Sequence, residues 1–149
     1  MGVGFGFAIA AQSLNPNKKV IMVVGDSAFG FSGMELETAA RYKMPLKIIV
    51  INNNGIATGV SEIEEDGTPK SIRPSALLPQ AQYEMVSVAF GGKGKEVSKH
   101  GELRETLQTA LADNNMWVIN CRIAPNASKK AQSFSWLTVK GEDMEPKIP

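Results

Sequence analysis

The segment VIMVVGDSAFGFSGME, residues 20–35, decides the fold more than any other stretch of the chain. Residues 20–24 form a continuous apolar run with several β-branched side chains, which is typical of a strand covered on both faces. In SGME, residues 32–35, a serine precedes a glutamate by three positions, which is the pattern of a helix capping box. We therefore expect a buried strand and then a helix over about 33–42, with Met34 facing inward.

The residues on either side continue this pattern. Residues 46–51 form a second apolar run that predicts another buried strand, and residues 5–14 predict a helix packed on all sides. Further along, residues 80–90 and 102–113 predict helices, and residues 117–123 predict a third strand. A strand, a helix and a strand with short connections indicate a right-handed βαβ unit. The predicted fold class is therefore α/β with a mostly parallel sheet.

The composition is that of an ordinary soluble domain. The 149 residues carry a net charge of +1, are 43% hydrophobic and include one cysteine, Cys121. The small charge gives no reason to expect a nucleic acid or an anionic membrane surface as partner. The apolar run over residues 3–11 is too short to span a bilayer. We expect a single domain over residues 1–137, followed by a flexible tail over 138–149.

Two polar clusters follow the first two predicted strands, GDS at residues 25–27 and NNNG at residues 52–55. In an open parallel sheet, ligands bind beyond the carboxyl ends of the strands, and a short crossover places two such ends side by side. The carboxylate of Asp26, the side-chain oxygen of Asn53 and the carbonyl of Gly55 suit Mg²⁺. This ion takes few protein ligands and leaves its other positions to phosphate and water.

The start of the following helix suits the anion that such a metal ion would accompany. Backbone N–H groups at Ser27 and Ala28 are placed to meet a diphosphate. Each polar cluster alone is also typical of a tight turn or a helix cap, and their joint position at two strand ends favours a binding site. His100, on a predicted turn, and Cys121, inside a predicted strand, favour structural roles. The long polar stretch over residues 52–78 favours a functional loop.

Residues 25–35 and the Asn-Asn pair at 52–53 resemble the thiamine diphosphate-dependent decarboxylase and lyase superfamily. The signature of that superfamily is Gly-Asp-Gly or Gly-Asp-Ser, followed downstream by Asn-Asn. GDSAFGFSGME is similar to the branch that contains 2-hydroxyacyl-CoA lyase and oxalyl-CoA decarboxylase. AFGGKG at residues 89–94 and KAQSFSWL at residues 130–137 are more similar to the lyase than to the decarboxylase.

The resemblance implies roles for individual residues. The spacing of 27 positions from Asp26 to Asn53 matches the signature, and these two residues with the carbonyl of Gly55 would hold Mg²⁺. The implied contacts with thiamine diphosphate are Asp26, Ser27, Ala28, Asn53, Gly55 and Ile56. A three-layer α/β/α arrangement is the fold that the resemblance implies.

The resemblance also implies a reaction. The lyase splits a 2-hydroxyacyl-CoA into formyl-CoA and an aldehyde shortened by one carbon, and the thiazolium ring of the cofactor carries the demanding chemistry. Two alternatives stay open. The chain could come from an oxalyl-CoA decarboxylase, or it could be a non-catalytic binding or assembly module that keeps the fold.

Members of this family are longer, and an N-terminal domain supplies the glutamate that activates the cofactor. No segment here corresponds to it, so we expect a C-terminal fragment that is inactive alone and contains no catalytic residue. Ala57 stands where the family has a tyrosine. The parent enzyme is expected to act on an acyl-CoA, to form a homodimer or homotetramer, and to be peroxisomal or cytoplasmic, with no nucleic-acid or membrane partner.

Overall fold

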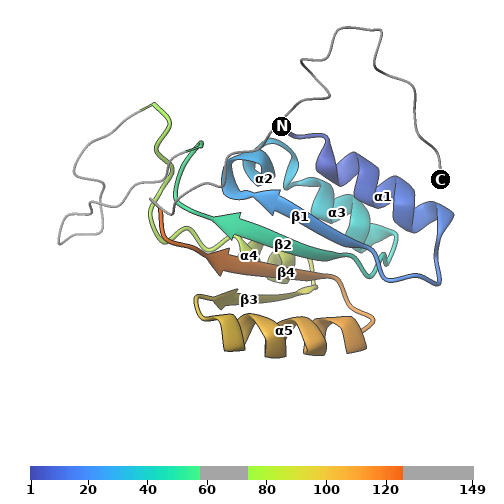
Figure 1. Ribbon diagram of the computed structural model, residues 1–149. Coiled ribbons are helices and arrows are strands. Elements are labelled where there is room, and N and C mark those ends of the chain that lie inside the picture. The colour runs from blue at the N-terminus through green and yellow to red at the C-terminus, as the bar shows by residue number, and fades with distance from the viewer. Residues whose placement is uncertain (58–73, 126–149) are drawn as a thin grey trace, which may run out of the picture.

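A four-stranded sheet is the centre of the molecule in the computed structural model, which describes residues 1–57 and 74–125 (Figure 1). All neighbouring strands are parallel, in the order β1-β2-β4-β3. The two central strands, β2 and β4, are the most deeply buried, which explains their almost unbroken apolar sequences. The strands are β1 (Ile21–Gly25), β2 (Lys47–Asn52), β3 (Lys93–Val97) and β4 (Trp117–Arg122).

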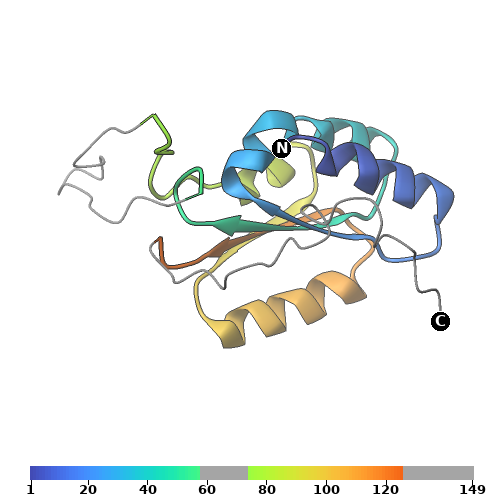
Figure 2. The same cartoon turned by 45° about the horizontal axis from the view of Figure 1, so that its top comes forward.

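Helices cover both faces of the sheet, which confirms the three-layer α/β/α arrangement (Figure 2). Four of them supply side chains to a core on one face, and the fifth packs alone on the other. Among the described residues, no helix is long and apolar enough to cross a membrane. The helices are α1 (Gly4–Leu14), α2 (Asp26–Ser32), α3 (Glu35–Arg41), α4 (Glu84–Ala89) and α5 (His100–Ala112).

The larger core lies between the sheet and helices α1 to α4. Phe5, Phe29 and Leu36 from three different helices meet Ile48 and Val50 of β2 there, and all five side chains are buried. A smaller core on the opposite face joins α5 to β3 and β4. Each fully buried aliphatic or aromatic side chain contributes roughly 1.5–3 kcal/mol by leaving water. The two cores therefore fix the positions of the strand ends that carry the polar clusters.

Two predicted elements are present but less enclosed than expected. Helix α1 was predicted to be packed on all sides, yet Phe7 and Leu14 are 72% and 83% exposed. Strand β1 was predicted to be covered on both faces, yet Val23 is 63% exposed. Both predictions were wrong. β1 lies at the edge of the sheet, and α5 packs against β3 and β4 on the face where Val23 is exposed. α1 packs on the opposite face and buries only one side, which carries Phe5, Ala8 and Gln12.

The helix after β1 differs from the expected capping box. Residues 26–32 already form α2, and a second helix, α3, begins at Glu35. The hydroxyl of Ser32 donates to the carbonyl of Gly2 at 2.7 Å instead of capping α3. Met34, expected to face inward, is 70% exposed. The prediction failed because Phe29 inserts into the core and stabilises a first helix that its Gly- and Ser-rich sequence does not favour.

Strand β3 was not predicted, because KGKEV has the polar composition of a surface segment. It is an edge strand, and edge strands commonly carry lysine. Helix α4 is shorter than the predicted 80–90 and begins at Glu84. The predicted flexible tail over 138–149, residues 130–137 and most of the predicted loop over 52–78 lie outside the described residues.

Candidate functional site

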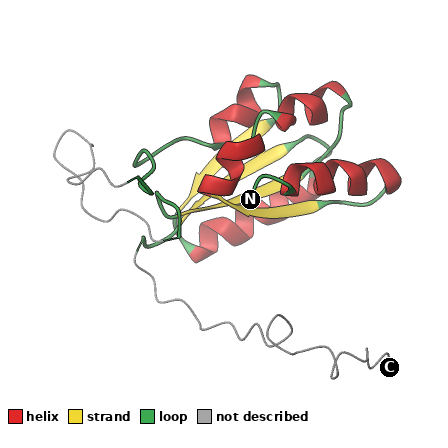
Figure 3. Ribbon diagram, turned by 90° about the horizontal axis from the view of Figure 1, so that it is seen from above, coloured by secondary structure: helices red, strands yellow, loops and turns green. Residues whose placement is uncertain are grey.

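The two polar clusters meet at the carboxyl edge of the sheet. Strands β1 and β2 are paired in parallel with Gly25 opposite Ile51, so the residues that follow each strand emerge together. Figure 3 shows the loops after the strands gathered at this one end of the molecule. The side chain of Asp26 lies between the two segments. The juxtaposition predicted from the strand order is therefore confirmed.

Asp26 joins both segments through its carboxylate. Oδ1 accepts from the N–H of Ser27 at 2.7 Å. Oδ2 accepts from the N–H of Asn53 at 3.2 Å and from that of Gly55 at 3.1 Å. One side chain thus fixes the first turn of α2 and the loop after β2. Because a carboxylate has about four lone-pair positions, these bonds leave acceptor capacity for a further partner.

The charge of Asp26 lacks a counter-charge within the described part of the chain. The residue is 2% exposed, and none of the ion pairs formed by the described residues includes it. A buried charge is costly unless it is paired or coordinates a metal ion. Three N–H groups reduce this cost without cancelling the charge. The buried carboxylate therefore fits a role in binding a cation better than it fits a purely structural turn.

Oxygen atoms next to Asp26 are suited to a hard cation. The side chain of Asn53 uses its amide nitrogen to donate to the carbonyl of Ala57 at 3.3 Å, which leaves its oxygen for another partner. The loop is held by an isolated antiparallel bridge between Gly55 and Ala76. Among residues 1–57 and 74–125, no three His, Cys, Asp or Glu side chains are placed so that they could hold a metal ion together. The site thus matches a metal ion that takes one carboxylate and relies on phosphate and water.

The remaining predicted cofactor contacts lie around this loop. Ser27 and Ala28 belong to the first turn of α2 and are half-buried. The N–H groups of a first helical turn lack intrahelical acceptors, and that of Ser27 is taken by Asp26. Ile56 follows Gly55 in the loop after β2 and is 39% exposed. The structure brings all six predicted residues to one place, and their contacts with a cofactor stay a prediction.

A buried polar network beneath the loop was missed by the sequence analysis. Asn52 accepts from the N–H of Asn54 at 3.0 Å and donates to Oδ1 of Asn120 at 3.1 Å. Asn120 in turn donates to Glu84 at 2.8 Å and to the carbonyl of Ala81 at 3.1 Å. The only available signal was an asparagine inside the otherwise apolar stretch WVINC of β4. Such a residue needs buried partners, and the sequence does not name them.

Tyr83, at the start of α4, is a second neighbour that the sequence analysis did not identify. Its ring packs edge-on against Phe29 of α2, with ring centroids 5.5 Å apart. Burial raises the pKa of the Tyr83 hydroxyl, and the negative charge of Asp26 raises it further. The half-buried hydroxyl of Tyr83 therefore stays neutral near the carboxylate of Asp26.

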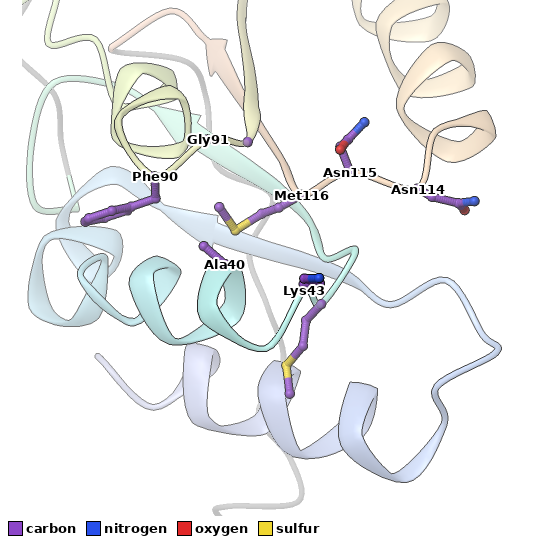
Figure 4. Close-up of a pocket in the computed structure, with 9 residues that line it drawn as sticks. Ala40, Lys43, Phe90, Gly91, Asn114, Asn115 and Met116 are labelled. Atoms are coloured by element: carbon purple, nitrogen blue, oxygen red, sulfur yellow. The ribbon is translucent and has the colours of Figure 1, made fainter.

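A cavity of about 350 Å³ lies at the opposite edge of the sheet (Figure 4). It is lined in part by Lys43, Gly92 and Met116, which immediately or closely precede the strands. Ligands of parallel sheets bind at the carboxyl edge, so this cavity is separate from the site around Asp26. His100 begins α5 as an exposed residue, and Cys121 is buried in β4. Cys121 is paired with Ile51, next to the second polar cluster, and burial raises the pKa of its thiol, which favours the structural role predicted for it.

The comparison with protein families identifies the kind of domain. A sequence model described as "Thiamine pyrophosphate enzyme, C-terminal TPP binding domain" matches residues 1–121. The chain belongs to this family. Thiamine pyrophosphate is another name for thiamine diphosphate, so the predicted cofactor and the predicted family are both confirmed. The match includes both polar clusters and all four strands, apart from Arg122 at the end of β4.

Individual relatives agree with this assignment. The chain is 46% identical to 2-hydroxyacyl-CoA lyase 1 of Mus musculus, and the alignment covers 93% of this chain and 26% of that protein. The same enzyme of Homo sapiens is also 46% identical, with the same coverage. Oxalyl-CoA decarboxylase of Escherichia coli (strain K12) is 39% identical, over 94% of this chain and 24% of that protein.

A solved structure supports the fold. The thiamine diphosphate-dependent 4-hydroxybenzoylformate decarboxylase of Rhodococcus jostii RHA1 matches with a TM-score of 0.65 and 22% sequence identity, over 87% of this chain and 24% of that chain. At this identity the similarity shows the α/β fold alone. The chain spans about a quarter of the length of the curated relatives that it matches.

Proposed function

We propose that this domain holds Mg²⁺ and the diphosphate of thiamine diphosphate within a 2-hydroxyacyl-CoA lyase-like enzyme. The observation that carries the proposal is the buried carboxylate of Asp26, which has no cationic partner among the described residues. It lies where two strand ends meet, and the family to which the chain belongs binds thiamine diphosphate.

Each residue of the site has a distinct task in this proposal. Asp26, Asn53 and the carbonyl of Gly55 would hold the metal ion, and the first turn of α2 at Ser27 and Ala28 would meet the diphosphate. Ile56 would provide apolar contact beside the loop. When bound, thiamine diphosphate supplies a thiazolium carbon that attacks a carbonyl group and accepts the electrons of a breaking carbon–carbon bond. The residues of this chain anchor and orient the cofactor for that step.

The substrate assignment rests on relative similarity. The two mammalian 2-hydroxyacyl-CoA lyases are 46% identical to this chain, against 39% for the oxalyl-CoA decarboxylase. We therefore place the cleavage of 2-hydroxyacyl-CoA to formyl-CoA and a shortened aldehyde first, and oxalyl-CoA decarboxylation second. The acyl-CoA substrate, homo-oligomeric assembly and a peroxisomal or cytoplasmic location belong to the same proposal for the full-length enzyme. A non-catalytic module that keeps the fold is the remaining alternative.

Binding of the cofactor by the purified chain tests the proposal. Asp26→Asn keeps the size of the side chain and removes its charge, so the Mg²⁺-dependent affinity for thiamine diphosphate should fall about tenfold or more. Isothermal titration calorimetry with and without Mg²⁺ measures this affinity. Glu37→Gln is the matched control, because Glu37 is an exposed carboxylate of α3 that pairs with Arg41. Equal affinities of Asp26→Asn and the unchanged chain would contradict the assignment of Asp26.

A further inference from the structure

We propose that the buried network of Glu84, Asn120 and Asn52 makes the site selective for Mg²⁺ over Ca²⁺. These side chains would not touch the ion or the cofactor, so they act as positioning residues. The inference rests on the proposed function, because it assumes that the loop after β2 provides metal ligands. It adds residues of β4 and α4, at the other end of a chain of hydrogen bonds, to the determinants of that site.

The network is deeply buried, and both hydrogens of its central amide have acceptors. Asn120 is completely buried, Asn52 is 2% exposed and Glu84 is 7% exposed. Asn52 and Asn120 lie on the same face of the sheet, because Asn120 is opposite Val50 in the pairing of β2 with β4. Both hydrogens of the Asn120 amide have acceptors, Glu84 and the carbonyl of Ala81. A side chain held in this way has one available orientation.

The direction of the hydrogen bonds is set by the two acceptors of the Asn120 amide, the carboxylate of Glu84 and the carbonyl of Ala81. An ionised carboxylate only accepts hydrogen bonds, so Asn120 must turn its NH₂ group toward Glu84 and its oxygen toward Asn52. Asn52 then donates through its own NH₂ group, and its oxygen faces the N–H of Asn54. If either amide were turned over, two donors or two acceptors would face each other. Glu84 and the carbonyl of Ala81 therefore fix, through Asn120, the orientation of the Asn52 amide, which immediately precedes the loop after β2.

The consequence for the loop is that three successive N–H groups are fixed. Those of Asn53 and Gly55 donate to Asp26, and that of Asn54 donates to Asn52. Asn54 has a φ of 61°, in the left-handed region that asparagine adopts more readily than most residues. The loop is thus held by the carboxylate of Asp26 and by the network, in addition to its bridge with Ala76.

A rigid loop discriminates between metal ions by geometry. Mg²⁺ requires near-ideal octahedral coordination at short distances, whereas Ca²⁺ accepts longer and more irregular arrangements. Releasing the N–H of Asn54 would let the neighbouring oxygens of Asn53 and Gly55 move apart. Such movement should weaken the binding of Mg²⁺ strongly and that of Ca²⁺ little. Asp26, which supplies the charge, would attract both ions as before.

The test compares two metal ions in variants of the full 149-residue chain. Asn120→Leu removes the central amide at similar volume. In the presence of thiamine diphosphate, its dissociation constant for Mg²⁺ should rise about tenfold or more, and that for Ca²⁺ by about threefold at most. Glu84→Gln keeps an acceptor oxygen for Asn120, so the ratio of the two dissociation constants should stay that of the unchanged chain. Thr106→Val is the control, because Thr106 is a buried polar residue of α5 outside this network.

A second measurement does not depend on a bound ligand. Amide hydrogen exchange followed by NMR in the metal-free chain should show faster exchange at Asn54 in Asn120→Leu, while the N–H groups of β2 keep their protection. If Asn120→Leu does not fold, Glu84→Met breaks the network from its other end and should give the same two results. Equal weakening of Mg²⁺ and Ca²⁺, or unchanged exchange at Asn54, would overturn the inference. Failure of the unchanged chain to bind either ion with the cofactor would instead refute the proposed function.

Discussion

A completely buried lysine at the start of β2 is the most unusual single residue outside the site. Lys47 is completely buried, and its ammonium group donates to the backbone carbonyl of Asn115. Burial, and then the positive charge of Lys19, lowers the pKa of Lys47 from 10.5 to about 8. The charged form is therefore disfavoured in the folded state. It is retained at neutral pH because the lowered pKa of about 8 still lies above 7.

The lowered pKa makes a prediction for the free energy of unfolding. Below pH 8, Lys47 is charged in both states and the cost of burying its charge is present in full. As the pH rises from 8 toward 10.5, the folded state loses the proton first, so the free energy of unfolding should rise. A pKa unit corresponds to about 1.4 kcal/mol, so this gain is on the order of 3 kcal/mol.

The comparison of Lys47→Met with the unchanged chain isolates this effect, because the other groups that titrate in this range are common to both. Urea unfolding at several pH values should show the unchanged chain gaining stability relative to Lys47→Met between pH 8 and 10. A stability difference that is independent of pH would show that the pKa of Lys47 is not lowered.

At the scale of elements, the packing of α4 against β3 depends on a glycine. A Cβ atom placed on Gly94 would collide with the backbone carbonyl of Glu84. Gly94→Ala should therefore reduce the free energy of unfolding by about 1–3 kcal/mol, since backbone atoms cannot move aside cheaply. Thermal or urea denaturation measures this loss.

Gly101→Ala is the matched control for this substitution. Gly101 lies in the first turn of α5, and nothing is within 4 Å of the position of an added Cβ. Alanine there should stabilise the chain by up to about 1 kcal/mol, because glycine is the poorer helix former. Similar effects of both substitutions would contradict the idea that close contact between α4 and β3 requires Gly94.

The sequence predicted those elements whose pattern reports burial directly. β2 and β4 were found because both faces of each are covered, and α1 was found from its apolar run. β3 and α2 were missed because their stability comes from neighbours that are distant in the chain. β3 pairs with β4, and α2 is held by Phe29 packing against Phe5 and Tyr83. Local composition carries no record of such contacts.

In the candidate site, too, local sequence predicts some residues, and others depend on contacts between distant parts of the chain. The juxtaposition of Asp26 with Asn53 and Gly55 could be predicted because the polar clusters follow two strands that are consecutive in the chain. Asn120 and Glu84 could not be assigned in this way. Their contacts with Asn52 and with each other join residues 68 and 36 positions apart, through β4 and α4. Only the order of strands in the sheet brings them under the loop.

At the scale of the whole molecule, one surface of strand β1 is apolar and left uncovered by the described residues. Ile21 and Val23 are 46% and 63% exposed, although both belong to a central apolar run of the sequence. The chain also spans only about a quarter of the length of its curated relatives. In the proposed full-length enzyme, other parts of the protein would supply the remaining groups around the cofactor.

The proposed function predicts different activities for the 149-residue chain alone and for the full-length enzyme. The chain alone, supplied with thiamine diphosphate, Mg²⁺ and a 2-hydroxyacyl-CoA, should form no formyl-CoA above the uncatalysed background. The full-length enzyme should show a higher kcat/KM for 2-hydroxyacyl-CoA than for oxalyl-CoA. Chromatographic detection of formyl-CoA measures both. Turnover by the chain alone would refute the proposed need for other groups, and a preference for oxalyl-CoA would favour the decarboxylase.

The carboxylate of Asp26 also has a consequence for biosynthesis. It joins backbone groups that lie 27 and 29 positions further along the chain. While the polypeptide is being made, this side chain leaves the ribosome well before its partners, and it stays hydrated until the second strand has docked on the first. Under the proposed function, the cofactor site therefore forms only when β1 and β2 have paired in the correct register. Cofactor binding by a newly made chain would then report that these two strands have paired.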